Sequence, residues 1–194
     1  MEDLLQEDVR NNSAWSHRYF VVFGHEELLV LEGEDGKGEM VRKELFELIQ
    51  KGEGPLVADN EVVGREVEYT KGKIELAPMN LSAWNYLKGV LRRGARKLGS
   101  EREFCERFVR PEEGGEVDSE GTKRDGGGGE LDFEGDGVRS SHAIDWLAEI
   151  YAEQGEKEKA RKCLEALGRK WDPIRKNYWD YRIKLMGEGK YAGT

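Results

Sequence analysis

Residues 11–22 read NNSAWSHRYFVV, and residues 80–91 read NLSAWNYLKGVL. Aligned without gaps, the two segments pair Asn11 with Asn80 and Trp15 with Trp84, and a Ser-Ala step precedes the Trp in both copies. The shared Asn-x-Ser-Ala-Trp pattern is too specific to arise from composition. Internal repetition is the signature of stacked-unit architectures, so we predict that the chain is built from repeated units.

Each copy is predicted to begin an α-helix, the first at about 11–23. Asn is a favoured N-cap residue, because its side-chain oxygen accepts a hydrogen bond from a backbone N–H of the first turn. Helical spacing then predicts one inward stripe in each copy, at positions 14, 15, 18, 21 and 22 and at 83, 84, 87, 90 and 91. Arg18 interrupts the first stripe, and a buried arginine needs a carboxylate or carbonyl partner. Two roles remain open for Arg18: it bridges adjacent repeats, or it reaches a partner subunit.

Other segments extend the helical pattern. Residues 61–93 read as a helix, a tight turn at Pro78 and a second helix, and antiparallel helix pairs of this kind are the unit of α-solenoids. Residues 140–167 turn at Gly155 and resemble the tetratricopeptide pattern. The predicted fold class is therefore all-α, an α-α superhelix (solenoid) of tetratricopeptide-like helical hairpins.

These segments resemble the C-terminal half of the α subunit shared by protein farnesyltransferase and type I geranylgeranyltransferase. The resemblance rests on NNSAWSHRYFVV, on EVEYTKGKIELAPMNLSAWNYLKGVL and on DPIRKNYWDY near the end of the chain. The positions that match the family's repeat motif are Asn11 or Asn12, Trp15 and Arg18 in the first copy, and Asn80 and Trp84 in the second. In the second copy Leu87 replaces the arginine that the motif often carries.

The resemblance implies an α subunit that wraps around a β subunit in a heterodimer. Such enzymes transfer a farnesyl or geranylgeranyl group from an isoprenyl diphosphate to the cysteine of a C-terminal Cys-a-a-X motif. By the same resemblance, the β subunit holds a Zn²⁺ ion, which lowers the pKa of the substrate thiol and makes it a nucleophilic thiolate. The implied Zn²⁺ belongs to the partner, and no cofactor is expected on this chain.

The family's α subunit contributes a lysine from repeats of the type Lys-Asn-Tyr-x-x-Trp-x-His-Arg. This chain has Val9, Arg10, Asn11 and Asn12 where such a lysine would be needed, so no catalytic residue is carried over. That departure predicts either a fragment of a longer α subunit, which the start within a repeat array favours, or a natural truncation that is inactive alone. The alternative function is a non-catalytic helical-repeat adaptor, suggested by the tetratricopeptide-like segment and the missing catalytic repeats.

Three regions are predicted along the chain. They are α-type repeats at 1–110, an acidic glycine-rich insert at 111–139 and C-terminal helical repeats at 140–188. Within the first region, about 24–60 is interpreted as a loop insertion. The insert at 111–139 is predicted to be disordered, because it has too little apolar surface to offset the entropy of ordering.

Composition narrows the class of protein further. The net charge of −9 argues against a nucleic-acid binder, and the absence of a long apolar run argues against a membrane span. The acidic N-terminal segment does not resemble a signal peptide, so a cytoplasmic location is expected. Cys105 and Cys163 lack metal-site spacing and are predicted to be thiols. Trp15 and Trp84 are interpreted as core residues and His17 as an ordinary helix residue.

Overall fold

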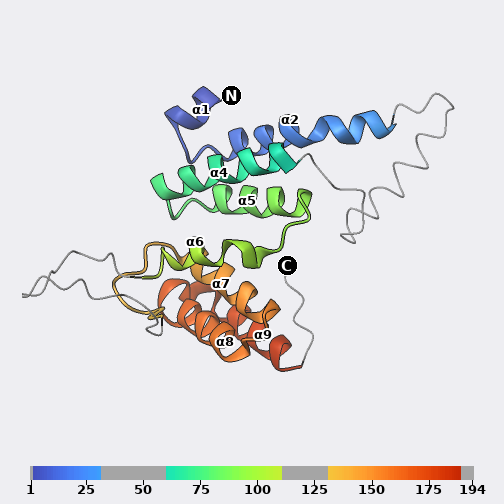
Figure 1. The fold of residues 1–194 in the computed structure, drawn as a ribbon. Helices are drawn as coiled ribbons and strands as arrows, with labels where there is room; N and C mark the ends of the chain where they lie inside the picture. Colours follow the sequence, from blue (N-terminus) through green and yellow to red (C-terminus); the bar gives the residue numbers. More distant parts are fainter. Residues whose placement is uncertain (1, 32–59, 111–130, 189–194) are drawn as a thin grey trace, which may run out of the picture. The chain divides into compact units, whose positions relative to one another are not determined.

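The computed structural model describes residues 2–31, 60–110 and 131–188 (Figure 1). Within these residues the regular secondary structure is helical, and no strand is present. The all-α prediction is therefore confirmed for the part of the chain that the structure describes. The chain divides into two compact units, Met1–Lys97 and Leu98–Thr194, and each unit is described by itself below.

The first unit holds four described helices. They are α1 (Glu2–Glu7), α2 (Asn12–Leu31), α4 (Asn60–Leu76) and α5 (Leu81–Arg93). Helices α4 and α5 form the predicted antiparallel pair (Figure 1). Helix α2 contacts α5. The stripe predicted for the second copy is completely buried on α5, and it consists of Ala83, Trp84, Leu87, Val90 and Leu91. The apolar side chains of this stripe recur at helical period, so they lie on one face of α5. Their burial stabilises the packing of α5 in the first unit.

Helix α2 differs from its prediction in two respects. It continues past Gly24 to Leu31, so the first part of the expected loop insertion is helical. The rest of that insertion, 32–59, lies outside the described residues. The predicted stripe is also incomplete, since Ala14, Trp15 and Arg18 are buried whereas Val21 is 50% exposed.

The second unit is built from short helices. They are η1 (Leu98–Glu101), α6 (Arg102–Glu106), α7 (Ser141–Glu153), α8 (Lys157–Ala166), the π-helical turn η2 (Leu167–Trp171), η3 (Pro173–Arg175) and α9 (Lys176–Gly187). Helices α7 and α8 form the predicted hairpin, and Gly155 supports its turn with a φ of +79°, which glycine adopts without a Cβ penalty. Pro173 opens a 3₁₀ turn ahead of α9.

The prediction of disorder is wrong for 131–139. Phe133 and Val138 are buried, the backbone N–H of Arg139 donates to the carbonyl of Phe108 at 2.7 Å, and the indole N–H of Trp171 donates to the carbonyl of Phe133 at 2.7 Å. The prediction rested on the average composition of 111–139, which is acidic and glycine-rich. That average does not reflect the two apolar side chains, Phe133 and Val138, that pack in the structure. Residues 111–130 lie outside the described residues.

Candidate functional site

Each Trp of the duplicated motif forms a hydrogen bond with the loop that precedes its own helix. The indole N–H of Trp15 donates to the carbonyl of Val9, and that of Trp84 donates to the carbonyl of Pro78, both at 2.8 Å and both across six residues. The alignment that pairs the two Trp residues also pairs Val9 with Pro78. Both Trp side chains are buried, which confirms their interpretation as core residues.

The two Asn residues cap the helices, as the sequence predicted. The side-chain oxygen of Asn11 accepts from the backbone N–H of Ala14 at 3.1 Å. The side-chain oxygen of Asn80 accepts from the backbone N–H of Ser82 at 3.2 Å. Each oxygen satisfies a backbone donor that the first helical turn leaves without an intrahelical partner.

The second motif also binds the first. The side-chain amide of Asn80 donates to the carbonyl of Val9 at 2.7 Å, so that one carbonyl accepts both this amide and the indole of Trp15. The hydroxyl of Ser82 donates to the side-chain oxygen of Asn12 at 3.0 Å. Four residues of the two motif copies, Asn12, Trp15, Asn80 and Ser82, thus come together where α2 and α5 begin. We call this cluster, with Val9, the motif interlock.

Arg18 bridges helices within the first unit. Its Nε lies 2.7 Å from Oε2 of Glu66 on α4, and its Nη2 lies 3.0 Å from Oε1 of the same carboxylate. The hydroxyl of Tyr86 on α5 donates to Oε2 of Glu66 at 2.8 Å, and the Arg18 guanidinium lies 3.7 Å from the ring centre of Tyr69. Of the two roles left open by the sequence, the structure places Arg18 in the bridge, with 7% of its surface exposed.

Electrostatics stabilise this arrangement in one protonation state. Burial works against the charge on Arg18, but the hydrogen bond and the charge of Glu66 outweigh it and raise the pKa of Arg18. Burial, together with the hydrogen bond to Glu66, raises the pKa of Tyr86 well above its usual range. The cluster is thus a charged pair with a neutral phenol donor, which suits a structural link rather than proton transfer.

The C-terminal unit repeats the same use of Trp and Arg. Trp179 and Arg182 have the spacing of Trp15 and Arg18, although the preceding Asn stands at a different distance. Both side chains are buried, and Arg182 pairs with Asp145 and, at 3.5 Å, with Glu149, both on α7. In both units a Trp-x-x-Arg helix therefore places its arginine against a carboxylate of a neighbouring helix.

Sequence reasoning missed the partners of Arg18. Glu66 is completely buried and stands with Thr70 on the stripe of α4 that also contains Val63, Val67 and Ile74. A carboxylate on an otherwise uncharged stripe was the available signal, because a buried charge requires a partner of opposite sign. His17 is exposed on α2, in line with its interpretation as an ordinary helix residue.

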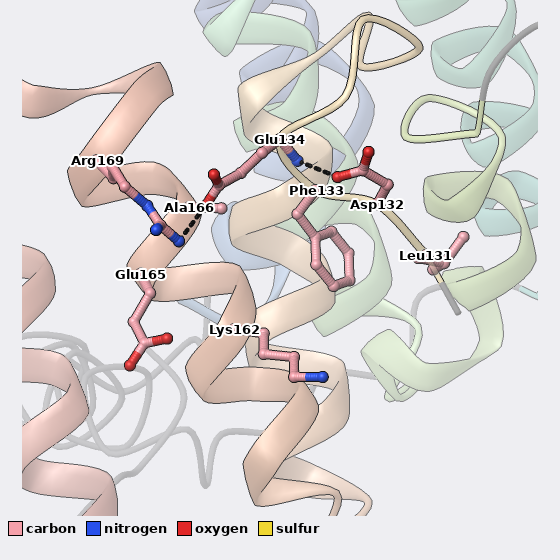
Figure 2. A pocket seen from close by; sticks show the side chains of 8 residues that line it. All are labelled: Leu131, Asp132, Phe133, Glu134, Lys162, Glu165, Ala166 and Arg169. Atoms are coloured by element: carbon pink, nitrogen blue, oxygen red, sulfur yellow. Dashed lines mark hydrogen bonds and ion pairs between the residues drawn. The ribbon is translucent and has the colours of Figure 1, made fainter. Parts of the chain in front are cut away.

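A pocket of about 470 Å³ lies in the second unit, between the loop at 131–134 and α8 (Figure 2). Its lining residues are Leu131, Asp132, Phe133, Glu134, Lys162, Glu165, Ala166 and Arg169. Asp132 accepts from the backbone N–H groups of Glu134 and Gly135, and Glu134 pairs with Arg169. The lining includes no Cys, Ser, Thr or His, so the pocket offers none of these nucleophiles, and the contacts of Asp132 and Glu134 stabilise the loop.

Two features of the described residues bear on the class of site. Within 2–31, 60–110 and 131–188, no group of three or more His, Cys, Asp or Glu side chains is placed to hold a metal ion. Among the same residues, no helix has the length and apolar character that crossing a bilayer requires. Cys105 and Cys163 are buried thiols outside any disulfide, as predicted.

Comparisons with known proteins agree with the motif geometry. The family model described as protein prenyltransferase alpha subunit repeat matches residues 1–24 and 63–94, which contain the motif interlock and the Arg18–Glu66 pair. The protein farnesyltransferase/geranylgeranyltransferase type-1 subunit alpha of Candida albicans is 35% identical over 131 residues, which is 68% of this chain and 35% of the relative. The subunit of the same name from Dictyostelium discoideum is 24% identical over 191 residues, 97% of this chain and 44% of the relative.

A solved structure, Candida albicans protein geranylgeranyltransferase-I complexed with GGPP, aligns with a TM-score of 0.66 and 29% identity over 95% of this chain and 44% of that chain. The chain thus spans less than half the length of the curated relatives described above. The predicted helical-repeat fold and the predicted family are both confirmed. This chain belongs to the family of protein prenyltransferase α subunits that are built from the Asn–Trp helical repeat.

Proposed function

We propose that this chain forms part of the α subunit of a heterodimeric protein prenyltransferase and acts as a scaffold for the β subunit. The complex would transfer a farnesyl or geranylgeranyl group from an isoprenyl diphosphate to the cysteine of a Cys-a-a-X motif, in the cytoplasm. The observation that carries the proposal is the motif interlock, because the residues that match the family repeat are the ones that join α2 to α5.

The chemistry is assigned to the partner. The zinc that activates the substrate thiol would be held by the β subunit, and Val9 and Arg10 stand where the family's lysine would be needed. Arg18 and Glu66, the buried ion pair of the first unit, are committed to one another, which suits a structural role. We therefore expect this chain alone to be inactive.

An apolar surface beside the motif interlock is a suitable contact for the β subunit. Leu76 is 75% exposed, and Met79 and Leu81 are also largely exposed, so three apolar side chains surround the turn between α4 and α5. Asn80 and Ser82 of the interlock belong to the same turn and helix start. We call Leu76, Met79 and Leu81 the turn patch and propose that it packs against the β subunit, since such exposed apolar patches mark protein interfaces.

The test is co-expression of this chain with a farnesyltransferase β subunit, followed by co-purification and a prenyl-transfer assay on a Cys-a-a-X peptide. Stable association without activity is the expected result. Met79→Glu should reduce co-purification. Ile174→Glu should not, because Ile174 is an even more exposed apolar residue that lies in the second unit, outside the turn patch. Activity of the complex would show that the family's lysine, in whose place Val9 and Arg10 stand, is dispensable, and equal loss for both variants would overturn the turn patch.

The second candidate function is a helical-repeat adaptor. It is supported by the α7–α8 hairpin, in which Leu147, Tyr151, Ala160 and Leu167 are buried at positions that resemble the tetratricopeptide pattern. The names of the relatives, both α subunits of a protein prenyltransferase, favour the first candidate. A folded chain that fails to associate with any prenyltransferase β subunit would favour the adaptor.

A further inference from the structure

Both copies of the duplicated motif contain the tripeptide Asn-x-Ser, which is the acceptor sequence for N-linked glycosylation. The two tripeptides are residues 11–13, Asn-Asn-Ser, and residues 80–82, Asn-Leu-Ser, and the sequence contains no other Asn-x-Ser or Asn-x-Thr. Neither middle residue is proline, so both tripeptides meet the sequence requirement. The residues that define the repeat are therefore also two possible sites of modification.

Glycosylation at such a site joins a sugar to the side-chain amide nitrogen of the asparagine. The donor is an oligosaccharide held on a lipid through a diphosphate. A bond forms between Nδ2 and C1 of the first sugar, and the bond between C1 and the diphosphate oxygen breaks. The diphosphate leaves with the electron pair, and Nδ2 loses one proton. The product is a bulky group that belongs at a protein surface, so the surroundings of Nδ2 decide whether the fold can hold it.

In the second copy this nitrogen is part of the motif interlock. Nδ2 of Asn80 donates to the carbonyl of Val9 at 2.7 Å, and the same carbonyl accepts from the indole of Trp15. Asn80 is only 8% exposed, so a sugar ring bonded to Nδ2 competes with the Val9 segment for the same space. Displacement of the side chain would also withdraw its oxygen from the backbone N–H of Ser82, which it caps.

The first copy places its asparagine differently. Asn11 is half-buried, and its side-chain oxygen caps α2 by accepting from the backbone N–H of Ala14 at 3.1 Å. A sugar on Nδ2 of Asn11 leaves that oxygen in place, because glycosylation retains the amide carbonyl. Ser13, which completes the acceptor sequence, is exposed. The two motif copies are thus equal as acceptor sequences and unequal as attachment points.

We propose that Asn80 is a latent N-glycosylation site whose use is incompatible with the folded repeat. Because Asn80 is buried in the folded chain, the sugar can be added only before folding, as in a chain that enters a compartment where this reaction takes place. A chain modified there cannot form the motif interlock, so the chain reaches its folded state only where N-glycosylation is absent. The proposal rests on the interlock, and its failure would leave the prenyltransferase role untouched.

The experiment is cell-free translation of the full chain in two arms. In one arm a cleavable secretory signal directs the chain into microsomes that carry out N-glycosylation, and in the other the chain is made without signal or microsomes. The chains compared are the unchanged chain, Ser13→Ala, Ser82→Ala and the double variant. Each substitution removes one acceptor sequence but keeps its asparagine, so both caps and the bond from Asn80 to Val9 remain. Ser82→Ala loses the exposed hydrogen bond to Asn12.

Gel mobility before and after glycosidase treatment counts the glycans, and limited proteolysis measures folding. In microsomes the unchanged chain should gain two glycans, each single variant one and the double variant none. Ser82→Ala and the double variant should keep a protease-resistant core there, whereas the unchanged chain and Ser13→Ala, which carry a glycan on Asn80, should lose it. Without microsomes all four chains should be equally resistant, which separates the effect of the glycan from that of the substitutions.

Trimming the glycan to a single sugar with an endoglycosidase should not restore the resistance of Ser13→Ala, because the first ring already occupies the space beside Val9. A glycosylated Ser13→Ala chain that is as resistant as Ser82→Ala would overturn the proposal, since the interlock would then tolerate a sugar on Nδ2. Absence of a glycan on Asn80 in microsomes would overturn it as well, because the site would not be an acceptor. Equal loss of resistance in the two single variants would assign the damage to glycosylation in general and would also contradict the proposal.

Discussion

Arg18 and Glu66 form a two-point ion pair inside the first unit, with Nε–Oε2 at 2.7 Å and Nη2–Oε1 at 3.0 Å. The Glu66 carboxylate is completely buried and also accepts a hydrogen bond from the hydroxyl of Tyr86. Residues from α2, α4 and α5 therefore contact one another at this carboxylate. A buried pair of this kind is satisfied only as a whole, because loss of either partner leaves a charge in a low-dielectric interior. The pair therefore fixes how the repeated helices sit on one another.

Removal of one partner should destabilise the first unit strongly. Arg18→Leu, which introduces the residue found at the aligned position 87, is expected to cost about 3–5 kcal/mol because it leaves the Glu66 carboxylate unpaired. Adding Glu66→Gln should recover much of this loss, since the amide oxygen still accepts from Tyr86 and no buried charge remains. Urea unfolding measures both. Arg65→Ala is the control, because exposed Arg65 lies 3.5 Å from the same carboxylate and should contribute no more than about 1 kcal/mol.

A pair of Asn substitutions separates capping from the motif interlock. Asn80→Asp keeps the cap oxygen but replaces the amide donor with an oxygen that faces the carbonyl of Val9, so we expect a loss of about 1–3 kcal/mol. Asn11→Asp also keeps its cap and should be neutral or slightly stabilising, because an acidic N-cap interacts well with the helix dipole. Equal effects of the two variants in urea unfolding would contradict the interlock.

The repeat and the caps could be predicted from sequence because they depend on local spacing. Asn11, Trp15, Asn80 and Trp84 act within about one or two turns of their own positions, through N-caps and through indole bonds to the preceding loop. The α4–α5 pair was predicted for the same reason, since its apolar stripe repeats at helical period. Interactions between residues that are close in sequence can be predicted from residue type and spacing alone.

The rest could not be predicted because it depends on contacts between distant segments. Nothing local pairs Arg18 with Glu66, or the Asn80 amide with Val9, across the long segment between the two motif copies. The loop at 131–139 is a similar case, since its acidic glycine-rich composition predicts disorder while Phe133 packs and accepts from Trp171. A composition-based prediction averages over the whole segment, whereas the order of 131–139 depends on individual apolar side chains such as Phe133 and Val138.

Two helix glycines should respond in opposite directions to alanine. A Cβ at Gly89 would meet Cε2 of Tyr19 at 2.8 Å, so Gly89→Ala forces the ring or the helix to shift and should cost about 1–3 kcal/mol despite its better helix propensity. Gly72→Ala on α4 meets nothing within 4 Å and should stabilise the unit by about 0.5–1 kcal/mol. Thermal unfolding of the two variants measures the contrast, and a stabilising Gly89→Ala would contradict the close packing of α2 on α5.

Stability should fall at alkaline pH through one buried tyrosine in each unit. Burial and the hydrogen bond to Glu66 raise the pKa of Tyr86, and burial together with the charge of Glu106 raises the pKa of Tyr151. An unfolded tyrosine has a pKa of about 10, so above that pH the unfolded chain loses these protons first and the free energy of unfolding declines. Below about pH 10 the contribution of both phenols is fully present.

The expected decline is up to about 1.4 kcal/mol per pH unit for each group. Urea unfolding of the wild type, Tyr86→Phe and Tyr151→Phe between about pH 8 and pH 11 measures it. Each variant removes an ionisable phenol, so the stability difference between wild type and variant should shrink as the pH rises above about 10. Tyr181→Phe, which changes an exposed tyrosine on α9, is the control and should follow the wild type across the series. A constant difference for Tyr86→Phe would mean that this phenol titrates alike in the folded and unfolded chain, and the neutral donor to Glu66 would have to be abandoned.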